Sequence, residues 1–206
     1  MTFRRLLVIS MLLAAPGAHA QERTTDPLGP LARCINGSPF KFRQQDRLPA
    51  QKTARSVKLA AGECQVSTAD GYRLMLYRES SAPFVNLKIE LSAAGRFDAD
   101  RDIILAQMQD MAASSKAPHR VALESETRNG VEVLGLNNPL VLNASGVISL
   151  YTLLHAASGT VATAYVLNQP AATREFSTDA QYLALRDQLL ATLVACLAAP
   201  EQRLAP

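Results

Sequence analysis

The chain lacks tryptophan and is poor in other aromatic residues, in cysteine and in histidine. Of its 206 residues none is Trp, 5% are aromatic, three are Cys and three are His. Alanine and leucine must therefore fill the core, and large aromatic anchors for a binding face are scarce. With 48% hydrophobic and 19% charged residues, the composition is that of a globular protein and excludes an intrinsically disordered chain.

Local motifs of catalysis and metal binding are also missing. The sequence contains no HExxH, CxxC or Gly-x-Ser-x-Gly pattern. Beyond the first twenty residues only His119 and His155 remain, and we expect both to be exposed. The sequence therefore predicts no catalytic residue, no cofactor and no metal site. A hydrolase that uses His119 or His155 remains an alternative, because a catalytic triad is assembled in space and not along the chain.

One acidic run has the spacing of a metal loop. Asp98, Asp100 and Asp102 alternate as calcium ligands do, but the glycine and glutamate that complete a calcium loop are missing. We instead expect these carboxylates in the first turn of a helix, where they cap free amides and interact favourably with the helix dipole.

The first twenty residues have the pattern of a cleavable secretory signal peptide. Arg4 and Arg5 precede an apolar stretch over 6–15, and Ala18-His19-Ala20 places small residues around a cleavage site. The apolar stretch of about ten residues is half of the roughly twenty that span a bilayer. No cysteine follows it, which argues against a lipoprotein. We therefore predict a periplasmic protein that starts near Gln21 and has no transmembrane anchor.

The charge is small in total but unevenly distributed. Loss of Arg4 and Arg5 with the signal would reduce the net charge from +3 to +1. Residues 21–58 contain eight basic and three acidic residues. This basic cluster is either a partner-binding patch for an acidic protein or phospholipid surface, or a solvated segment lying over the domain. Its members are Lys41, Arg43, Arg47, Lys52, Arg55 and Lys58. The near-neutral total and the lack of interleaved aromatics argue against nucleic-acid binding.

Three cysteines in an exported protein predict one disulfide and one free thiol. Cys34 and Cys64 would emerge consecutively during export and close a loop of about thirty residues, so we favour this pair. The alternative is Cys34 with Cys196, which would tie the N-terminal segment to the last helix. Cys196 lies in an apolar helical run and is otherwise expected to be a buried, inert thiol.

The periodicity of the chain predicts strands alternating with a few helices. We expect a short helix over 26–35, an extended wrapping segment over 38–54 and a short strand over 56–59. Strands are predicted over 72–78, 84–91, 120–127, 131–136, 146–155 and 160–168. Helices are predicted over 98–114, with a core stripe of Ile104, Met108 and Met111, and over 177–198. Ser177 or Thr178 would cap the second helix, and its core residues would be Leu185, Leu189, Leu193 and Cys196 or Leu197, widened by Leu183, Leu190 and Val194.

Two turns join the later strands into antiparallel hairpins. Asn129-Gly130 is a strong two-residue hairpin signal, and residues 156–159 form the second connection. The strands of the second hairpin are apolar on both faces, so we place them centrally between two helical layers. The expected fold is of the α+β class: an antiparallel sheet of about six strands flanked by helices on both faces. Residues 21–206 would form one domain, with 21–71 wrapped around 72–206.

This order of elements resembles the PsbP-like α/β/α sandwich of the extrinsic photosystem subunit P and of DcrB-type envelope proteins. The resemblance covers roughly 72–198, and its clearest stretches are 129–133, 148–153, 161–167 and 176–193. It implies a non-enzymatic accessory or binding protein, and the fold is also similar to that of some immunity proteins. The family has no shared motif, so no functional residue is carried over.

Three functional classes are considered from the sequence. The first is an exported, monomeric, non-catalytic protein that binds a protein partner, as an immunity protein, an inhibitor or an accessory protein. The alternative is a periplasmic carrier of a small apolar ligand held between sheet and helix, and less favoured is the hydrolase.

Overall fold

The computed structural model describes residues 29–49, 55–66, 68–80, 82–116, 120–138 and 146–199. The predicted signal peptide lies outside these residues. Seven strands form one sheet in the order β1 (Lys41–Pro49), β4 (Thr68–Tyr77), β5 (Val85–Ser92), β9 (Thr160–Asn168), β8 (Gly146–His155), β7 (Val131–Asn137) and β6 (Leu123–Arg128). Every neighbouring pair in this sheet is antiparallel. A separate hairpin joins β2 (Arg55–Leu59) to β3 (Gly62–Val66).

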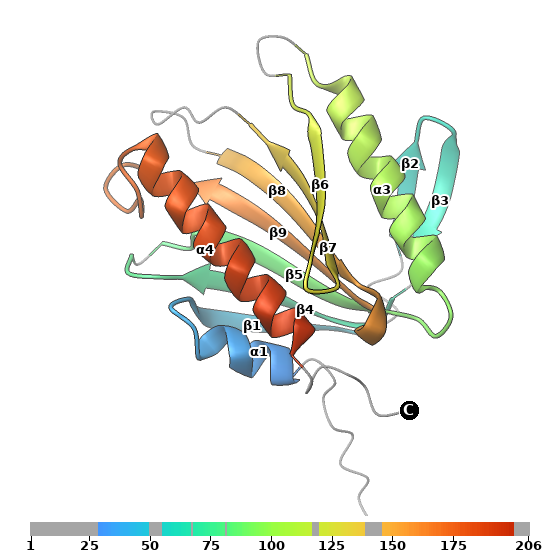
Figure 1. Ribbon diagram of the computed structural model, residues 1–206, viewed down its shortest axis with the longest axis horizontal. Helices are drawn as coiled ribbons and strands as arrows, with labels where there is room; N and C mark the ends of the chain where they lie inside the picture. The colour runs from blue at the N-terminus through green and yellow to red at the C-terminus, as the bar shows by residue number, and fades with distance from the viewer. Residues whose placement is uncertain are drawn as a thin grey trace, which may run out of the picture.

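Helices cover both faces of the sheet, which confirms the predicted α+β class (Figure 1). On one face α1 (Gly29–Asn36) and α4 (Asp179–Ala198) pack over β4, β5, β9 and β8. On the other, Ile104 and Met108 of α3 (Phe97–Ser114) pack on Leu134, Leu150 and other apolar residues of β7, β8 and β9. The β2–β3 hairpin lies beside α3. The result is two hydrophobic layers, one on each side of a common sheet.

The central position of β8 and β9 follows from their composition. Both strands have the predicted bounds, and the side chains of β8 are buried without alternation from Ile148 to His155. A strand buried on both faces needs cover on both faces. In β5, by contrast, buried and half-buried residues alternate at the start of the strand.

The segment over 38–54 does more than wrap around the domain. Residues 41–49 form β1, which pairs with β4 and adds an edge strand to the sheet. The sheet therefore has seven strands instead of about six. The expected boundary at residue 71 falls inside β4, so the N-terminal segment and the sandwich share one sheet.

The structure pairs Cys34 with Cys196, so our favoured pairing of Cys34 with Cys64 was wrong and the alternative is observed. Cys34 lies on α1, whose Leu31 and Ile35 are buried in the same core layer as α4. This packing brings the two cysteine Cα atoms to 5.6 Å, a normal disulfide separation. Cys64 is free and half-buried on β3.

The residues predicted to be buried on α3 and α4 are buried except at two positions. Ile104 and Met108 are buried, but Met111 is 43% exposed near the end of α3. On α4 the expected residues Leu185, Leu189, Leu190, Leu193, Val194, Cys196 and Leu197 are buried. Leu183 is also 43% exposed, because it points away from the sheet one residue after the buried Tyr182. The Thr178 hydroxyl caps α4 by accepting a hydrogen bond from the Gln181 N–H at 3.3 Å.

Candidate functional site

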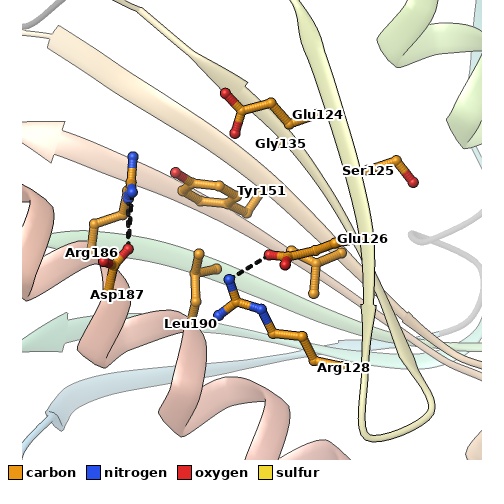
Figure 2. Close-up of a pocket in the computed structure, with 10 residues that line it drawn as sticks. Glu124, Ser125, Glu126, Arg128, Gly135, Tyr151, Arg186, Asp187 and Leu190 are labelled. Carbon is orange, nitrogen blue, oxygen red and sulfur yellow. Dashed lines mark hydrogen bonds and ion pairs between the residues drawn. The ribbon is translucent and has the colours of Figure 1, made fainter.

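A charged groove lies between α4 and the β6 edge of the sheet. Its volume is about 340 Å³. Figure 2 shows side chains of β6, the ring of Tyr151 on β8, and Arg186 and Asp187 on α4 around it. The lining residues are Glu124, Ser125, Glu126, Arg128, Val133, Gly135, Tyr151, Arg186, Asp187 and Leu190. Charges of both signs thus surround a small apolar floor.

A hydrogen-bond network connects α4 to the edge strand below the groove. The hydroxyls of Ser149 and Tyr151 both donate to Asn137 Oδ1, the first at 2.8 Å. Since Ser149 has one proton to donate, the Tyr182 hydroxyl on α4 donates to Ser149. Asn137 Nδ2 in turn donates to Glu124 Oε2 at 2.9 Å. The network therefore holds the Glu124 carboxylate at the rim of the groove.

The position of the Tyr151 ring depends on the absence of a side chain at Gly135. A Cβ at position 135 would lie 2.9 Å from Cε1 of the ring and 3.1 Å from Cδ1. Gly135 and Tyr151 are directly opposed residues on β7 and β8, and glycine within a strand commonly marks such a close approach. The absence of a side chain at Gly135 lets the ring lie flat over β7 and reach Asn137.

Four charged side chains of the groove form two ion pairs, while the fifth, Glu124, accepts its hydrogen bond from Asn137. Arg128 contacts Glu126 at 2.6 Å, and Arg186 contacts Asp187 at 2.9 Å. Burial lowers the pKa of Arg186, but its hydrogen bond to Asp187 and its proximity to Tyr151 outweigh this and raise the pKa above its usual value. Arg186 therefore stays cationic at any physiological pH.

The two tyrosines below the groove are held in the neutral form. Burial raises the pKa of Tyr151, although the neighbouring Ser149 and Asn137 side chains and the charge of Arg186 oppose the shift. Burial likewise raises the pKa of Tyr182 to about 12. Neither phenol can act as a base near neutral pH, and both serve as hydrogen-bond donors.

The described part of the basic cluster is divided between two places. Lys41 and Arg43 lie at the start of β1, where the Arg43 guanidinium stacks 4.4 Å above the Tyr77 ring. Arg47 is also in β1, whereas Arg55 and Lys58 belong to the β2–β3 hairpin on the other side of the molecule (Figure 1). Lys52 and the side chains of Arg47 and Arg55 lie outside the described residues.

His155 is buried, contrary to our expectation that it is exposed. It is 6% exposed, and its Nδ1 lies 2.8 Å from the Ser158 hydroxyl, which lies 2.8 Å from that of Thr160. All three side chains are buried at the 3₁₀ turn η1 (Ala156–Ser158) between β8 and β9. The Ser158 hydroxyl, buried between His155 and Thr160, stabilises this turn and is not accessible to a substrate. His119 lies outside the described residues.

The acidic run forms the start of α3 as expected, but without a capping hydrogen bond from a side chain. Asp98 and Asp100 lie in the first turn, while the N-cap residue is Arg96. Asp100 is fully buried and lies 3.7 Å from Arg96, whereas Asp102 contacts Arg101. Within the described residues, no three His, Cys, Asp or Glu side chains are grouped as metal ligands.

A second hollow lies on the opposite face of the sheet, over β4, β5 and β9. It has a volume of about 450 Å³ and is lined by Arg73, Met75, Asn86, Leu87, Lys88 and Tyr165. Its Lys88 ammonium lies 2.6 Å from the buried Glu90 carboxylate. This hollow sits on strands that are paired on both sides, so unlike the groove it does not adjoin a sheet edge.

Comparison with known proteins identifies no relative of this chain. No protein-family model matches it, and no curated protein and no solved structure shows significant similarity to it. The class of the protein is therefore defined by its own structure: an α+β protein with an antiparallel sheet between helical layers, held by a disulfide between the first and last helices. In the described part of the chain, no helix is long and apolar enough to cross a membrane.

Sequence reasoning did not find the groove, although one signal pointed to it. Counting outward from the Asn129-Gly130 turn sets Glu124 opposite Gly135, as the structure shows. A glycine inside an apolar strand then marks a position where another group approaches closely. The identity of that group, Tyr151, depends on the pairing of β7 with β8, and no short turn specifies that pairing.

Proposed function

We propose that this chain is an exported, non-catalytic binding protein of the periplasm that acts as a monomer on a protein partner. An immunity protein, an inhibitor and an envelope accessory protein are the concrete forms of this function, and the PsbP-like resemblance supports the same class. The disulfide is consistent with an oxidising compartment.

The groove beside β6 is the observation that carries the proposal. Its carboxylates and guanidinium groups are engaged in ion pairs and hydrogen bonds, and its tyrosines are neutral. Such a surface can recognise a partner by complementary charge and hydrogen bonding. A charged lining also suits a polypeptide better than an apolar small ligand.

Capture from envelope extract tests the proposal. The mature chain from Gln21 is used as bait, and the retained proteins are identified by mass spectrometry. We expect one protein to be retained by the wild type and lost with the double variant Glu124→Lys/Glu126→Lys. The control bait is Glu79→Lys, which reverses a carboxylate that is 81% exposed in the loop after β4. Recovery of no specific protein under several growth conditions contradicts the proposal.

The site of action is tested by the fate of the first twenty residues. The full chain is produced with its own N-terminus, and cell fractions are analysed by intact-mass spectrometry. We expect a periplasmic species that begins at Gln21. A cytosolic species that retains Arg4 and Arg5 contradicts the proposed export.

A further inference from the structure

We infer that β6 is the edge at which an extended, basic segment of the partner adds to the sheet as a further strand. This inference rests on the proposed binding function and names the chemistry of its partner. In the described part of the chain β6 pairs with β7 alone, and five of its six residues are exposed. Addition of a strand to such an edge is a common mode of peptide recognition.

The turn at Asn129-Gly130 determines which backbone groups of β6 face outward. These residues have φ angles of 49° and 79°, as in a type I′ turn. Arg128 and Val131 flank the turn as opposed residues. In a two-residue hairpin this closing pair exchanges hydrogen bonds, and bonded pairs then alternate along the ladder.

The alternation leaves every second residue of β6 available to another strand. Glu124 and Glu126 lie four and two residues from the closing residue Arg128, so their backbone groups face β7. The N–H and C=O groups of Leu123, Ser125 and Thr127 therefore point away from the sheet.

The two edges of the sheet differ in their protection against strand addition. The edge strand β1 has a register irregularity between Phe42 and Gln45 and ends at Pro49. Bulges and prolines are devices that prevent pairing at an edge. In contrast, β6 pairs with β7 in unbroken register and contains no proline. Of the two edges of the seven-stranded sheet, as far as the structure describes it, β6 alone offers a regular ladder.

The charges of β6 favour a basic partner strand. Glu124 and Glu126 share the face of β6 that borders the groove, and side chains of directly opposed residues on adjacent strands lie about 5 Å apart. Glu126 is paired with Arg128, but Glu124 accepts its hydrogen bond from the neutral Asn137. A lysine or arginine opposite Glu124 would supply the missing positive charge.

The same charges disfavour a second copy of this chain. In a dimer, β6 of one copy could pair antiparallel with β6 of the other through the outward residues Leu123, Ser125 and Thr127. Two such pairings keep most of the strand paired. One sets Glu124 against Glu126 twice, and the other sets Glu126 against Glu126 at its centre, although it also places Glu124 opposite Arg128. Like charges directly opposite one another destabilise a strand pair, and both self-pairings contain such a pair. A basic segment, which places positive charge opposite both glutamates, is therefore the better occupant.

Backbone amide exchange measured by NMR tests the inference with a defined probe. The probe is a short synthetic peptide in which lysine alternates with valine and threonine, and its control has glutamate in place of lysine. In the free protein we expect rapid exchange at Leu123, Ser125 and Thr127, and protection at Glu124 and Glu126. The lysine peptide should slow exchange at the first three amides and leave the other two unchanged.

Variants separate the backbone and charge contributions. Ser125→Pro removes one outward N–H at an edge position that tolerates proline, whereas Ser125→Ala keeps it. We expect binding of the lysine peptide to weaken at least about tenfold with Ser125→Pro and with Glu124→Lys/Glu126→Lys, and to stay unchanged with Ser125→Ala and Glu79→Lys. The charge variant keeps the test decisive if the proline variant does not fold.

Several outcomes overturn the inference. These are protection of the three outward amides in the free protein, failure of the lysine peptide to bind, equal binding of the glutamate peptide, and a dimer that forms through β6. If the wild type and Ser125→Pro capture the same envelope protein equally well, β6 is not the docking edge but the proposed binding function stands. If neither bait captures a specific protein, the proposed function itself fails.

Discussion

Individual side chains at the β6 edge depend on one another through Asn137. Its amide accepts from two hydroxyls on β8 and donates to Glu124 on β6. The position of one rim carboxylate is therefore coupled to the packing of Tyr151, and the packing of Tyr151 is coupled to the missing side chain at Gly135. Two substitutions test these couplings directly.

Gly135→Ala should reduce the free energy of unfolding by about 1–3 kcal/mol, because the added methyl group forces the buried Tyr151 ring to shift. Urea unfolding measures the loss. The matched control is the same substitution in a Tyr151→Ala background, where no ring opposes the methyl group and the cost should fall within about 0.5 kcal/mol. Equal costs in the two backgrounds would show that the ring is not the obstacle.

The ionisation of Tyr182 should make the protein less stable at high pH. Because burial raises the pKa of this phenol in the folded state to about 12, against about 10 when unfolded, folding favours its protonated form. The contribution is complete below pH 10 and is lost as the pH rises from 10 to 12. Two pKa units correspond to at most about 2–3 kcal/mol.

Tyr182→Phe isolates this effect. Urea unfolding at pH 8 and pH 11 should show a smaller alkaline loss of stability in the variant than in the wild type. Some loss should remain, because burial also raises the pKa of Tyr151. The comparison uses the pH-dependent change and not the absolute stability, since the variant also lacks the hydrogen bond to Ser149. Identical alkaline losses would contradict the assignment.

At the scale of elements, the η1 turn joins the two central strands through a buried polar cluster. His155, Ser158 and Thr160 contact one another within six residues of chain. A polar group buried without its partner costs about 1–3 kcal/mol, so the cluster stabilises the turn only while it is complete.

His155→Ala should therefore lower the free energy of unfolding by about 1–3 kcal/mol, because it leaves the buried Ser158 hydroxyl with one partner fewer. Urea unfolding provides the measurement. The double variant with Ser158→Ala should cost less than the sum of the two single variants, since both remove the same contact. Strict additivity would mean that the contact contributes nothing to stability.

Elements with a strong apolar pattern were predictable from the sequence, and those whose structure depends on a neighbour were not. The bounds of β8 and β9 follow from runs that are apolar on both faces. By contrast β1, with five charged or amide side chains within Lys41–Asp46, has no apolar period. Such polarity is typical of an edge strand, and only the pairing with β4 defines β1 as a strand.

The groove was harder to predict than the fold. Glu124, Asn137 and Tyr151 come from three strands, and they meet only after two hairpin registers are established. The burial of His155 was missed for a similar reason. A polar residue at the end of a strand is usually exposed, and the hydroxyl that contacts His155 comes from Ser158, in the turn that follows the strand.

At the scale of the whole molecule, the Cys34–Cys196 disulfide has the largest expected effect on stability. It spans a sequence separation of 162 residues, compared with 30 for the pair that we favoured from the sequence. In the chain-entropy model a longer loop restricts the unfolded chain more strongly, and a loop of this size contributes about 5 kcal/mol.

Reduction should lower the free energy of unfolding by about 3–5 kcal/mol, measured in urea with and without reductant. Cys64→Ala is the matched control, because it removes the free thiol and should leave the response to reductant intact. The double variant Cys34→Ala/Cys196→Ala should show no response. A loss of response in Cys64→Ala would assign the bond to Cys64 instead.

The same bond closes a covalent ring that contains all seven strands of the sheet, because they all lie between Cys34 and Cys196 in the chain. Tension applied between the two chain ends passes from Cys34 to Cys196 through the sulfur atoms and does not reach the strand ladders. Pulled from its termini, the oxidised molecule should thus resist mechanical unfolding of its sheet, and after reduction the same pull should unravel it.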